Sequence, residues 1–180
     1  MSNHIDFYFD IISPYAYIAH KKILKHKNII FNYKPVYLGG LHKLAGIDSP
    51  AFNKYKLKNN IKFKWNSNFP INSLSIMRGY IGVGKDKQND YLNCFFDAYW
   101  KHNHDLSNVE NILKLIKELK IDSEEFFQTI KEQSVKDKLI KLTSDAFQRE
   151  VFGTPTFIVN NKTFWGQDRL EYALEEFNTN

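Results

Sequence analysis

The chain has 180 residues, of which 43% are hydrophobic and 16% aromatic. This length suits a single domain, residues 1–180, and the apolar content is sufficient for a core, which excludes a disordered chain. The single cysteine, Cys94, excludes an internal disulfide and a Cys-x-x-Cys redox motif. The net charge of +5 comes from scattered lysines, so we interpret it as a solvated surface that attracts small anions at most, and we expect no nucleic-acid partner.

Targeting signals and membrane-spanning segments are not evident in the sequence. No window contains the roughly 18 apolar residues that a membrane-crossing helix needs, so we expect no membrane partner. The segment Met1–Asp6 has neither the basic nor the apolar region of a signal peptide, which predicts a cytoplasmic protein.

The first part of the chain has the pattern of two strands around a helix. Residues 5–9 form a short β-rich run, and residues 29–37 alternate well enough to form a second strand. Between them, residues 15–26 carry apolar side chains at helical spacing. Ser13 suits the N-cap of this helix and Pro14 its first turn. This β-α-β order predicts that the two strands are parallel.

The long middle of the chain, residues 39–150, is helical in pattern. The expected helices begin after Asn72 or Ser73, cover residues 90–101 and 109–119, begin again at Asp122, and cover residues 135–146. The spacing Ser107-x-x-Glu110 also predicts a capping box at the start of the third of these helices.

The end of the chain returns to strands. Residues 156–159 and 162–165 read as a β-hairpin around Asn160-Asn161, and residues 168–177 read as a final helix. The two ends together predict an α/β protein of thioredoxin-like fold, with residues 39–150 as a large α-helical insertion.

Three short segments contain candidate functional residues, and each also has a purely structural interpretation. Ser13 lies at a strand-to-helix junction, where free N–H groups and the helix dipole favour an anion, although it could simply cap its helix. Thr154 precedes Pro155. A cis bond there would expose the Thr154 backbone to a bound peptide, whereas a proline at a strand start is ordinary. Gln167 and Asp168 open the last helix, where they either bind a ligand carboxylate and ammonium or only cap the helix.

The sequence gives little indication of a metal site or a reactive cysteine. The six histidines lack partners at zinc-ligand spacing, and we interpret them as surface or loop residues. We interpret Cys94, beside Phe95 and Phe96, as a buried inert thiol. We therefore expect no metal site.

Several runs along nearly the whole chain resemble one known group of proteins. The runs are Asp6–Asp10, Ser13–Tyr17, Leu38–Gly40, Phe69–Leu74, Ala98–Trp100 with Asp105, Val151–Phe157 and Phe164–Leu170. They resemble the 2-hydroxychromene-2-carboxylate isomerases and the related kappa-class glutathione transferases, both in the DsbA-like branch of the thioredoxin superfamily. The last run and Ser-Pro-Tyr distinguish this group from the redox DsbA proteins.

The resemblance implies glutathione as the cofactor and a homodimer as the assembly. It implies that Ser13, flanked by Pro14 and Tyr15, holds the glutathione thiolate. It further implies that Thr154, before a cis Pro155, pairs with the cysteinyl backbone of glutathione. The γ-glutamyl end of the cofactor would then contact two residues further along the chain, Gln167 and Asp168.

The sequence departs from this family between Gly40 and Phe63, where it looks shorter and lacks an obvious counterpart, near Ile47-Asp48, of an asparagine of the family's neighbouring loop. Lys54 is a possible substitute for a glutathione-binding lysine of the family.

The function that the resemblance implies is a glutathione-dependent isomerisation of a small aromatic or conjugated carbonyl compound. A thiolate adds to the conjugated carbonyl, the former double bond rotates, and elimination returns the thiolate. Ser13 acts as the catalytic residue by holding and polarising that thiol, and is not itself the nucleophile. A kappa-like glutathione transferase and a non-catalytic glutathione- or peptide-binding protein stay open as alternatives. A thiol–disulfide oxidoreductase would need a cysteine at position 13.

Overall fold

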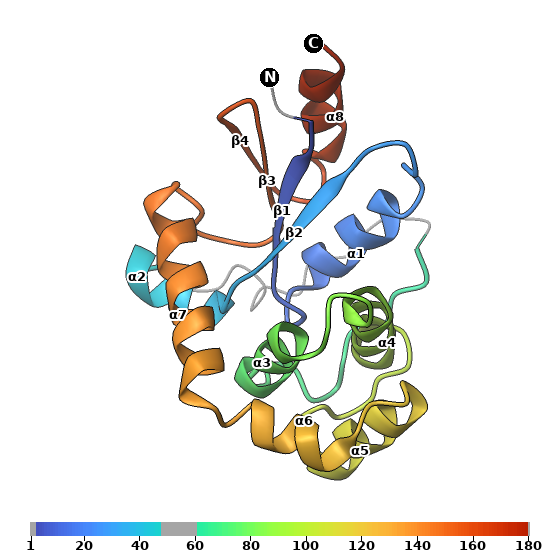
Figure 1. Ribbon diagram of the computed structural model, residues 1–180. Coiled ribbons are helices and arrows are strands. Elements are labelled where there is room, and N and C mark those ends of the chain that lie inside the picture. The colour runs from blue at the N-terminus through green and yellow to red at the C-terminus, as the bar shows by residue number, and fades with distance from the viewer. Residues whose placement is uncertain (1–2, 48–60, 180) are drawn as a thin grey trace.

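The computed structural model describes residues 3–47 and 61–179. The strands are β1 (Ile5–Phe9), β2 (Phe31–Pro35), β3 (Thr156–Val159) and β4 (Lys162–Trp165). The helices are α1 (Pro14–Ile23), α2 (Leu38–Ala45), α3 (Leu74–Gly82), α4 (Gln88–Trp100), α5 (Val109–Glu118), α6 (Ser123–Thr129), α7 (Gln133–Gln148) and α8 (Leu170–Asn178). Figure 1 shows the strands in the upper part of the molecule, with α3 to α6 below them and α7 along one side.

The two ends of the chain form one sheet, as the sequence predicted, and its strand order is β2-β1-β3-β4. β1 pairs in parallel with β2 and antiparallel with β3, so that Phe7 lies opposite both Tyr33 and Phe157. Asn160 and Asn161 turn the β3–β4 hairpin at φ values of 50° and 61°, which asparagine tolerates better than most residues. β2 is shorter than the predicted strand 29–37, because only residues 31–35 pair with β1.

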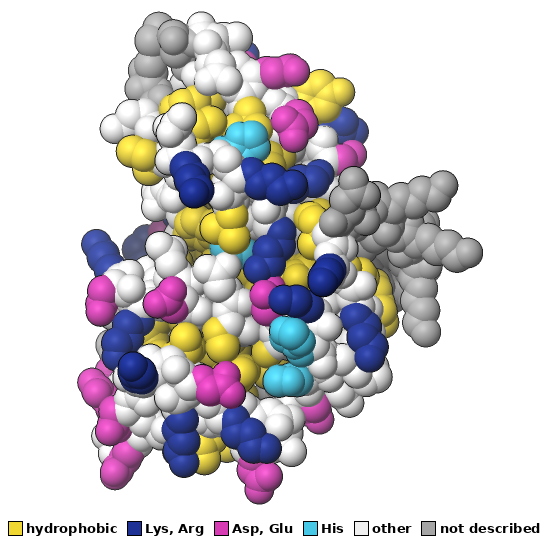
Figure 2. All heavy atoms as spheres, turned by 90° about the vertical axis from the view of Figure 1, so that its right-hand side faces the viewer, with side chains coloured by type: hydrophobic (Ala, Val, Ile, Leu, Met, Phe, Trp, Pro, Cys, Tyr) yellow, Lys and Arg dark blue, Asp and Glu magenta, His cyan; other side chains and the backbone are white. Residues whose placement is uncertain are grey.

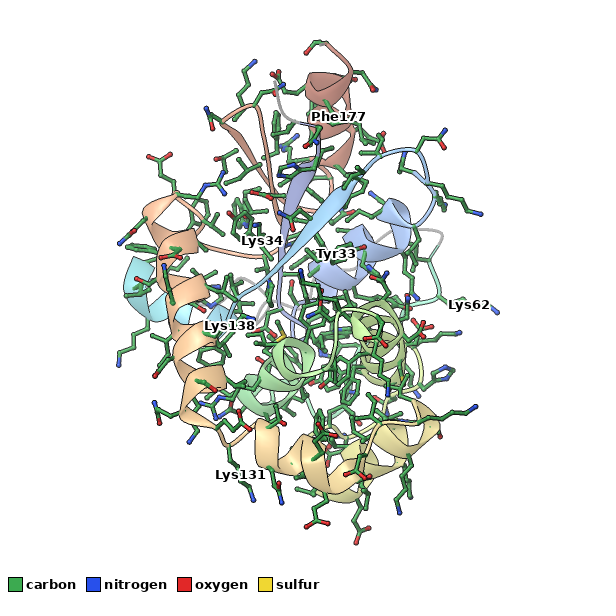
Figure 3. All side chains as sticks on the ribbon, viewed as in Figure 1. Tyr33, Lys34, Lys62, Lys131, Lys138 and Phe177 are labelled. Carbon is green, nitrogen blue, oxygen red and sulfur yellow. The ribbon has the colours of Figure 1, made fainter. Side chains whose placement is uncertain are left out.

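Successive side chains of β2 face different layers of the protein. Tyr33 lies on the same side of the sheet as Phe7, at 5.2 Å between ring centroids. Lys34 lies on the other side, where its Nζ is 3.8 Å from Asp6 Oδ1 (Figure 3). The sheet therefore has two covered faces, one with a large aromatic core and one with a smaller cluster that includes Tyr8 and Val36.

The helices between β2 and β3 complete this two-layered cover. α7 packs against α2, α3 and β2. At the end of α7, Arg149 Nη1 donates to Asp6 Oδ2 at 2.9 Å and to the Tyr8 hydroxyl at 2.6 Å, which ties the helix to β1. The fold is therefore α/β and thioredoxin-like, which confirms the predicted fold class.

Two details of the helical region differ from the sequence-based expectation. α2 begins at Leu38. Its pattern in the sequence is short, and it was not predicted as a separate helix. The predicted capping box at Ser107 is wrong: Asn108 is the N-cap of α5 and accepts from the Glu110 amide, while the Ser107 hydroxyl donates to Asp105 at 2.6 Å. The helix starts one residue later than the box requires, so the Asn108 side chain is the acceptor for the helix amide.

The interpretation of the histidines as surface or loop residues is wrong for His20. Its side chain is buried in α1, bonded to the Tyr33 hydroxyl at 3.0 Å and to Asn93 Oδ1 at 2.9 Å. Burial lowers the pKa of His20 to about 4, so this imidazole is neutral at physiological pH. Cys94 is half-buried, and burial raises the pKa of its thiol to about 11, which fits an inert thiol.

The surface carries charges of both signs. On the face shown in Figure 2, lysine and arginine side chains are interspersed with acidic and uncharged ones. Among the described residues, no helix has the length and apolar character needed to cross a membrane.

Candidate active site

A cavity of about 820 Å³ opens where five segments of the chain meet. These segments are the β1–α1 junction, the start of α2, residues 69–73, residues 152–155 and residues 165–169. Such a volume is within the usual range for small-molecule sites. The cavity thus lies between the two ends of the chain and the helical region that separates them in sequence.

All of the candidate site residues from the sequence line this one cavity. They are Ser13, Pro14, Tyr15, Thr154, Pro155, Gln167 and Asp168. The predicted lysine substitute, Lys54, lies outside the described residues.

Ser13 is held firmly at the start of α1. It is the N-cap residue, its side chain accepts from the Ala16 amide at 3.2 Å, and only 2% of the residue is exposed. Its hydroxyl donates to the Thr154 carbonyl oxygen at 2.9 Å. Ser13 is therefore both the helix cap of the structural interpretation and a bridge to the segment before β3.

The single hydrogen of the Ser13 hydroxyl limits what this residue can do. A hydroxyl has one donor, and in this arrangement the Thr154 carbonyl takes it. Donation to an anion in the cavity requires the hydroxyl to turn away from that carbonyl. A charged acceptor favours this exchange, because hydrogen bonds to ions are stronger than those to neutral oxygens.

The Thr154–Pro155 peptide bond is cis, and a second cis bond joins Phe69 to Pro70 on another wall of the cavity. Thr154 is 6% exposed, and its Oγ1 is buried with no hydrogen-bond partner among the described residues. A buried hydroxyl without a partner is uncommon in proteins.

The turn before α8 differs from the sequence-based expectation. Asp168 does not cap α8, because the helix begins at Leu170 after Arg169, and no side chain caps it. Gly166, at a φ of 115°, lets the chain turn, and the Arg169 amide closes the turn onto the Gly166 carbonyl at 3.1 Å. Gln167 and Asp168 therefore lie in this turn instead of in the first helical turn.

The two candidate residues of this turn are held differently. Lys22 Nζ donates to the Gln167 side-chain oxygen at 2.9 Å and to the Gln167 carbonyl at 3.2 Å, which joins the turn to α1. The Asp168 side chain is 62% exposed and has only a distant ion pair with Arg169, at 3.8 Å. Its carboxylate is therefore accessible to a cationic group of a ligand.

Several cavity residues were not predicted from the sequence. Phe152 and Trp165 pack together at 4.9 Å between ring centroids while both stay partly exposed. Tyr37 and His42 face the cavity from the start of α2; burial raises the pKa of Tyr37 and lowers that of His42. Phe152 and Trp165 lay in the runs that resemble the family, but nothing in their local pattern indicated that they would meet.

Behind the cavity, Asp10 was also missed. It is fully buried, and burial raises the pKa of its carboxyl to about 6 against four opposing hydrogen bonds. Its position within the Asp6–Asp10 run was visible in the sequence, but burial of the carboxylate was not. Among the described residues there is no group of three or more metal-ligating side chains.

The fold and the arrangement of the cavity define a thioredoxin-like protein of the DsbA type. The chain matches the DSBA-like thioredoxin domain family over residues 4–178, and it belongs to that family.

Two curated relatives are 2-hydroxychromene-2-carboxylate isomerases. The one from Sphingobium xenophagum is 22% identical over 98% of each chain. The one from Pseudomonas putida is 27% identical over 95% of this chain and 92% of its own. A solved structure of a 2-hydroxychromene-2-carboxylate isomerase has a TM-score of 0.85 at 23% identity, covering 97% of this chain and 94% of the other.

Proposed function

We propose that the protein is a glutathione-dependent isomerase that acts on a conjugated carbonyl compound of the 2-hydroxychromene-2-carboxylate type. The observation that carries the proposal is the convergence of Ser13, Thr154, Gln167 and Asp168, from three distant segments, on one cavity of about 820 Å³. Relatives with this isomerase name align with nearly the whole chain, which supports the same reaction class.

The cavity has polar groups that fit glutathione. Ser13 lies at the start of α1, where the helix dipole favours the negative charge of a thiolate. The backbone of Thr154 suits the cysteinyl part, since strand-like pairing is a common way to bind peptides. The exposed carboxylate of Asp168 suits the α-ammonium of the γ-glutamyl end. The buried Thr154 Oγ1 without a partner is a further polar group beside this path.

Glutathione, when bound, supplies a thiolate that adds reversibly to a conjugated carbonyl compound and so converts a double bond into a rotatable single bond. The protein's own part is to favour the ionised thiol and to hold it in place. The start of α1 contributes its dipole, and Ser13 turns its hydroxyl from the Thr154 carbonyl toward the anion. Lys22 holds the Gln167 turn against α1, which keeps the two halves of the cofactor site at a fixed separation.

The remaining walls suit a flat apolar substrate. Phe69, Phe152 and Trp165 bring aromatic surface to the cavity, and aromatic rings favour stacked or edge-on contacts with each other. Tyr37 and His42 add polar groups on the α2 side, where they can contact the oxygens of a substrate. We therefore assign the cofactor to the Ser13 side and the acceptor substrate to the aromatic side.

The proposal is tested with purified protein, 2-hydroxychromene-2-carboxylate and glutathione. We expect isomerisation that requires glutathione and leaves its concentration unchanged, followed by substrate absorbance and a thiol assay. Isomerisation at the same rate without glutathione would contradict the cofactor assignment, and no isomerisation under any condition would contradict the function.

A kappa-like glutathione transferase is the second candidate. The aromatic pair at the cavity is 36% exposed at Phe152 and 45% exposed at Trp165, so this side of the cavity opens to solvent and a conjugate could leave. With an electrophile such as an aryl halide, a transferase consumes glutathione and releases a stable conjugate. Thiol–disulfide exchange is not favoured, because position 13 is a serine and the thiol of Cys94 has a raised pKa.

A further inference from the structure

Asp10 joins three walls of the cavity through a single side chain. Its Oδ1 accepts from the Ile12 amide at 3.0 Å, and its Oδ2 accepts from the Leu38 amide and the Ser73 hydroxyl, both at 2.8 Å. Ile12, Leu38 and Ser73 all line the cavity, whereas Asp10 lies behind them, fully buried. The three donors come from the β1–α1 junction, the start of α2 and the start of α3.

The backbone of Asp10 extends this arrangement to Ser13. Its carbonyl oxygen accepts from the Ser13 amide at 3.0 Å, directly where the chain enters α1. One residue thus fixes the backbone of Ser13 through its main chain and the neighbouring walls through its side chain. Moving the carboxylate would change the position of all three segments together.

A buried carboxylate is costly unless it has hydrogen-bond partners. A simpler way to stabilise this position would be an apolar residue, as at Phe7 and Phe9 of the preceding strand β1. The carboxylate of Asp10 is instead surrounded by donors that belong to the cavity wall, which indicates a role in the site beyond stability of the core.

We infer that Asp10 is a positioning residue of the site, which sets the placement of the cavity walls around Ser13 and places a negative charge behind them. The inference rests on the proposed glutathione function. The negative charge of Asp10 opposes ionisation of a nearby thiol. Asp10 therefore affects both the geometry of the site and the pKa of the bound thiol, which it raises. A raised thiol pKa makes the ionised sulfur a stronger nucleophile and a poorer leaving group, since nucleophilicity falls as thiol pKa falls.

Ionisable groups lie on each of the described helices around Asp10. Tyr37 lies at the start of α2, and the Asp10 charge contributes to the raised pKa of its hydroxyl. His42 and Lys43 lie farther along α2, and Arg78 and Tyr80 lie on α3. The ionisable groups of α1 are Tyr15, Tyr17, His20, Lys21 and Lys22. Burial is the largest influence on Asp10 itself, and it raises the pKa of this carboxyl to about 6.

Two substitutions distinguish the effect of the position of the cavity walls from the effect of the Asp10 charge. Asp10→Asn removes the charge and replaces one acceptor oxygen with a donor, which opposes the Leu38 or Ile12 amide. Ser73→Ala removes only the bond to α3 and keeps the charge. A matched control is Asp6→Asn, since Asp6, on β1, is also a buried aspartate but pairs with Arg149 and lies outside the cavity.

The first measurement needs no ligand. Hydrogen exchange at the Ile12 and Leu38 amides is expected to accelerate at least tenfold in Asp10→Asn relative to the unchanged protein, with no such change in Asp6→Asn. Equal hydrogen-exchange rates at these amides in Asp10→Asn and the wild-type protein would overturn the positioning role, whether or not glutathione binds.

The second measurement uses glutathione itself, by calorimetry and by thiolate absorbance against pH. We expect about tenfold weaker binding in Asp10→Asn, about threefold weaker binding in Ser73→Ala, and unchanged binding in Asp6→Asn. Only Asp10→Asn should lower the pKa of the bound thiol. If Asp10→Asn does not fold, weaker binding by Ser73→Ala supports the inference and unchanged binding overturns it. Failure of the unchanged protein to bind glutathione would instead contradict the proposed function, and the exchange measurement would still decide the positioning role.

Discussion

Two strand-to-helix junctions face the cavity, and they are held very differently. At the β1–α1 junction, Ser13 is 2% exposed, caps its helix and donates to the Thr154 carbonyl. At the β4–α8 junction, the Asp168 side chain is 62% exposed, and no side chain caps the helix. The first junction is already ordered before a ligand arrives, while the second keeps a charged side chain in solvent.

The difference indicates how the two junctions contribute to function. A group that is held in place loses little freedom on binding, so its interactions are available in full. An exposed carboxylate is screened by water and must be ordered by the ligand, so its contribution is small. We therefore expect substitutions at the first junction to affect turnover strongly and those at the second to affect affinity weakly.

The largest effect is expected for Ser13→Ala. Loss of one positioned donor to a developing charge typically costs about 10²-fold in turnover, and we expect a loss of this size in the isomerase assay. Loss of the cap should also lower the free energy of unfolding by about 1 kcal/mol. Asn108→Ala is the control, because it removes the N-cap of α5 away from the cavity and should leave turnover unchanged. Comparable turnover by Ser13→Ala and the wild-type protein would contradict a functional role for this junction.

A second effect concerns the stability of the first junction against pH. The folded pKa of Asp10 is raised from 3.8 to about 6, so its contribution to stability is fully present below pH 3.8 and is lost as the pH rises through 6. Relative to Asp10→Asn, the unchanged protein should therefore lose about 2 kcal/mol of unfolding free energy between pH 4 and pH 7, on the order expected from 1.36 kcal/mol per pKa unit. Urea unfolding of both proteins at several pH values measures this difference. A difference that does not change with pH would contradict the burial of an ionised Asp10.

A third effect tests the division of the cavity into a cofactor side and a substrate side. Trp165→Ala removes an aromatic wall, and we expect the KM for the acceptor substrate to rise about fivefold, equivalent to the ~1 kcal/mol of an aromatic contact. Glutathione affinity, measured by calorimetry, should stay within twofold. Phe147→Ala is the control, because Phe147 is a partly exposed aromatic residue of α7 outside the cavity. Weaker glutathione binding with an unchanged KM would reverse the assignment of the two sides.

The smallest effect is expected at the second junction. Asp168→Asn should weaken glutathione binding about threefold, in keeping with the ~0.2–1 kcal/mol of exposed ion pairs. The effect should diminish at high salt, because the carboxylate is exposed to solvent. Glu171→Gln, an exposed acid in the first turn of α8, should change neither affinity nor its salt dependence. An effect of Asp168→Asn as large as that of Ser13→Ala would contradict the contrast between the junctions.

The same contrast shows how much the sequence could predict. Ser13 and Pro14 have strong local preferences for a helix start, and the β-rich runs and the Asn160-Asn161 turn indicate strands at both ends, so the sheet and the first junction could be predicted. The start of α8 could not be placed correctly, because Asp168 and Glu171 match a capping pattern that the backbone does not follow. Local pattern does not determine which of several polar residues a helix uses as its cap.

The missed parts of the site depend on contacts between distant segments. Asp10 gains its role from donors on α2 and α3, and Trp165 meets Phe152 from another segment. A single sequence does not report such contacts, and the burial of a carboxylate is not visible from its neighbours in the chain. The resemblance to a known family supplied Thr154 and Gln167, which composition and spacing alone would have left as ordinary turn residues.

The central claim is that Ser13 stabilises a glutathione thiolate at the start of α1. The most direct test is the absorbance of bound thiolate against pH in the unchanged protein and in Ser13→Ala. We predict that binding lowers the thiol pKa below the ~8.5 of a free thiol and that Ser13→Ala raises it again by about one unit or more. Identical titration curves for the two proteins would contradict the claim.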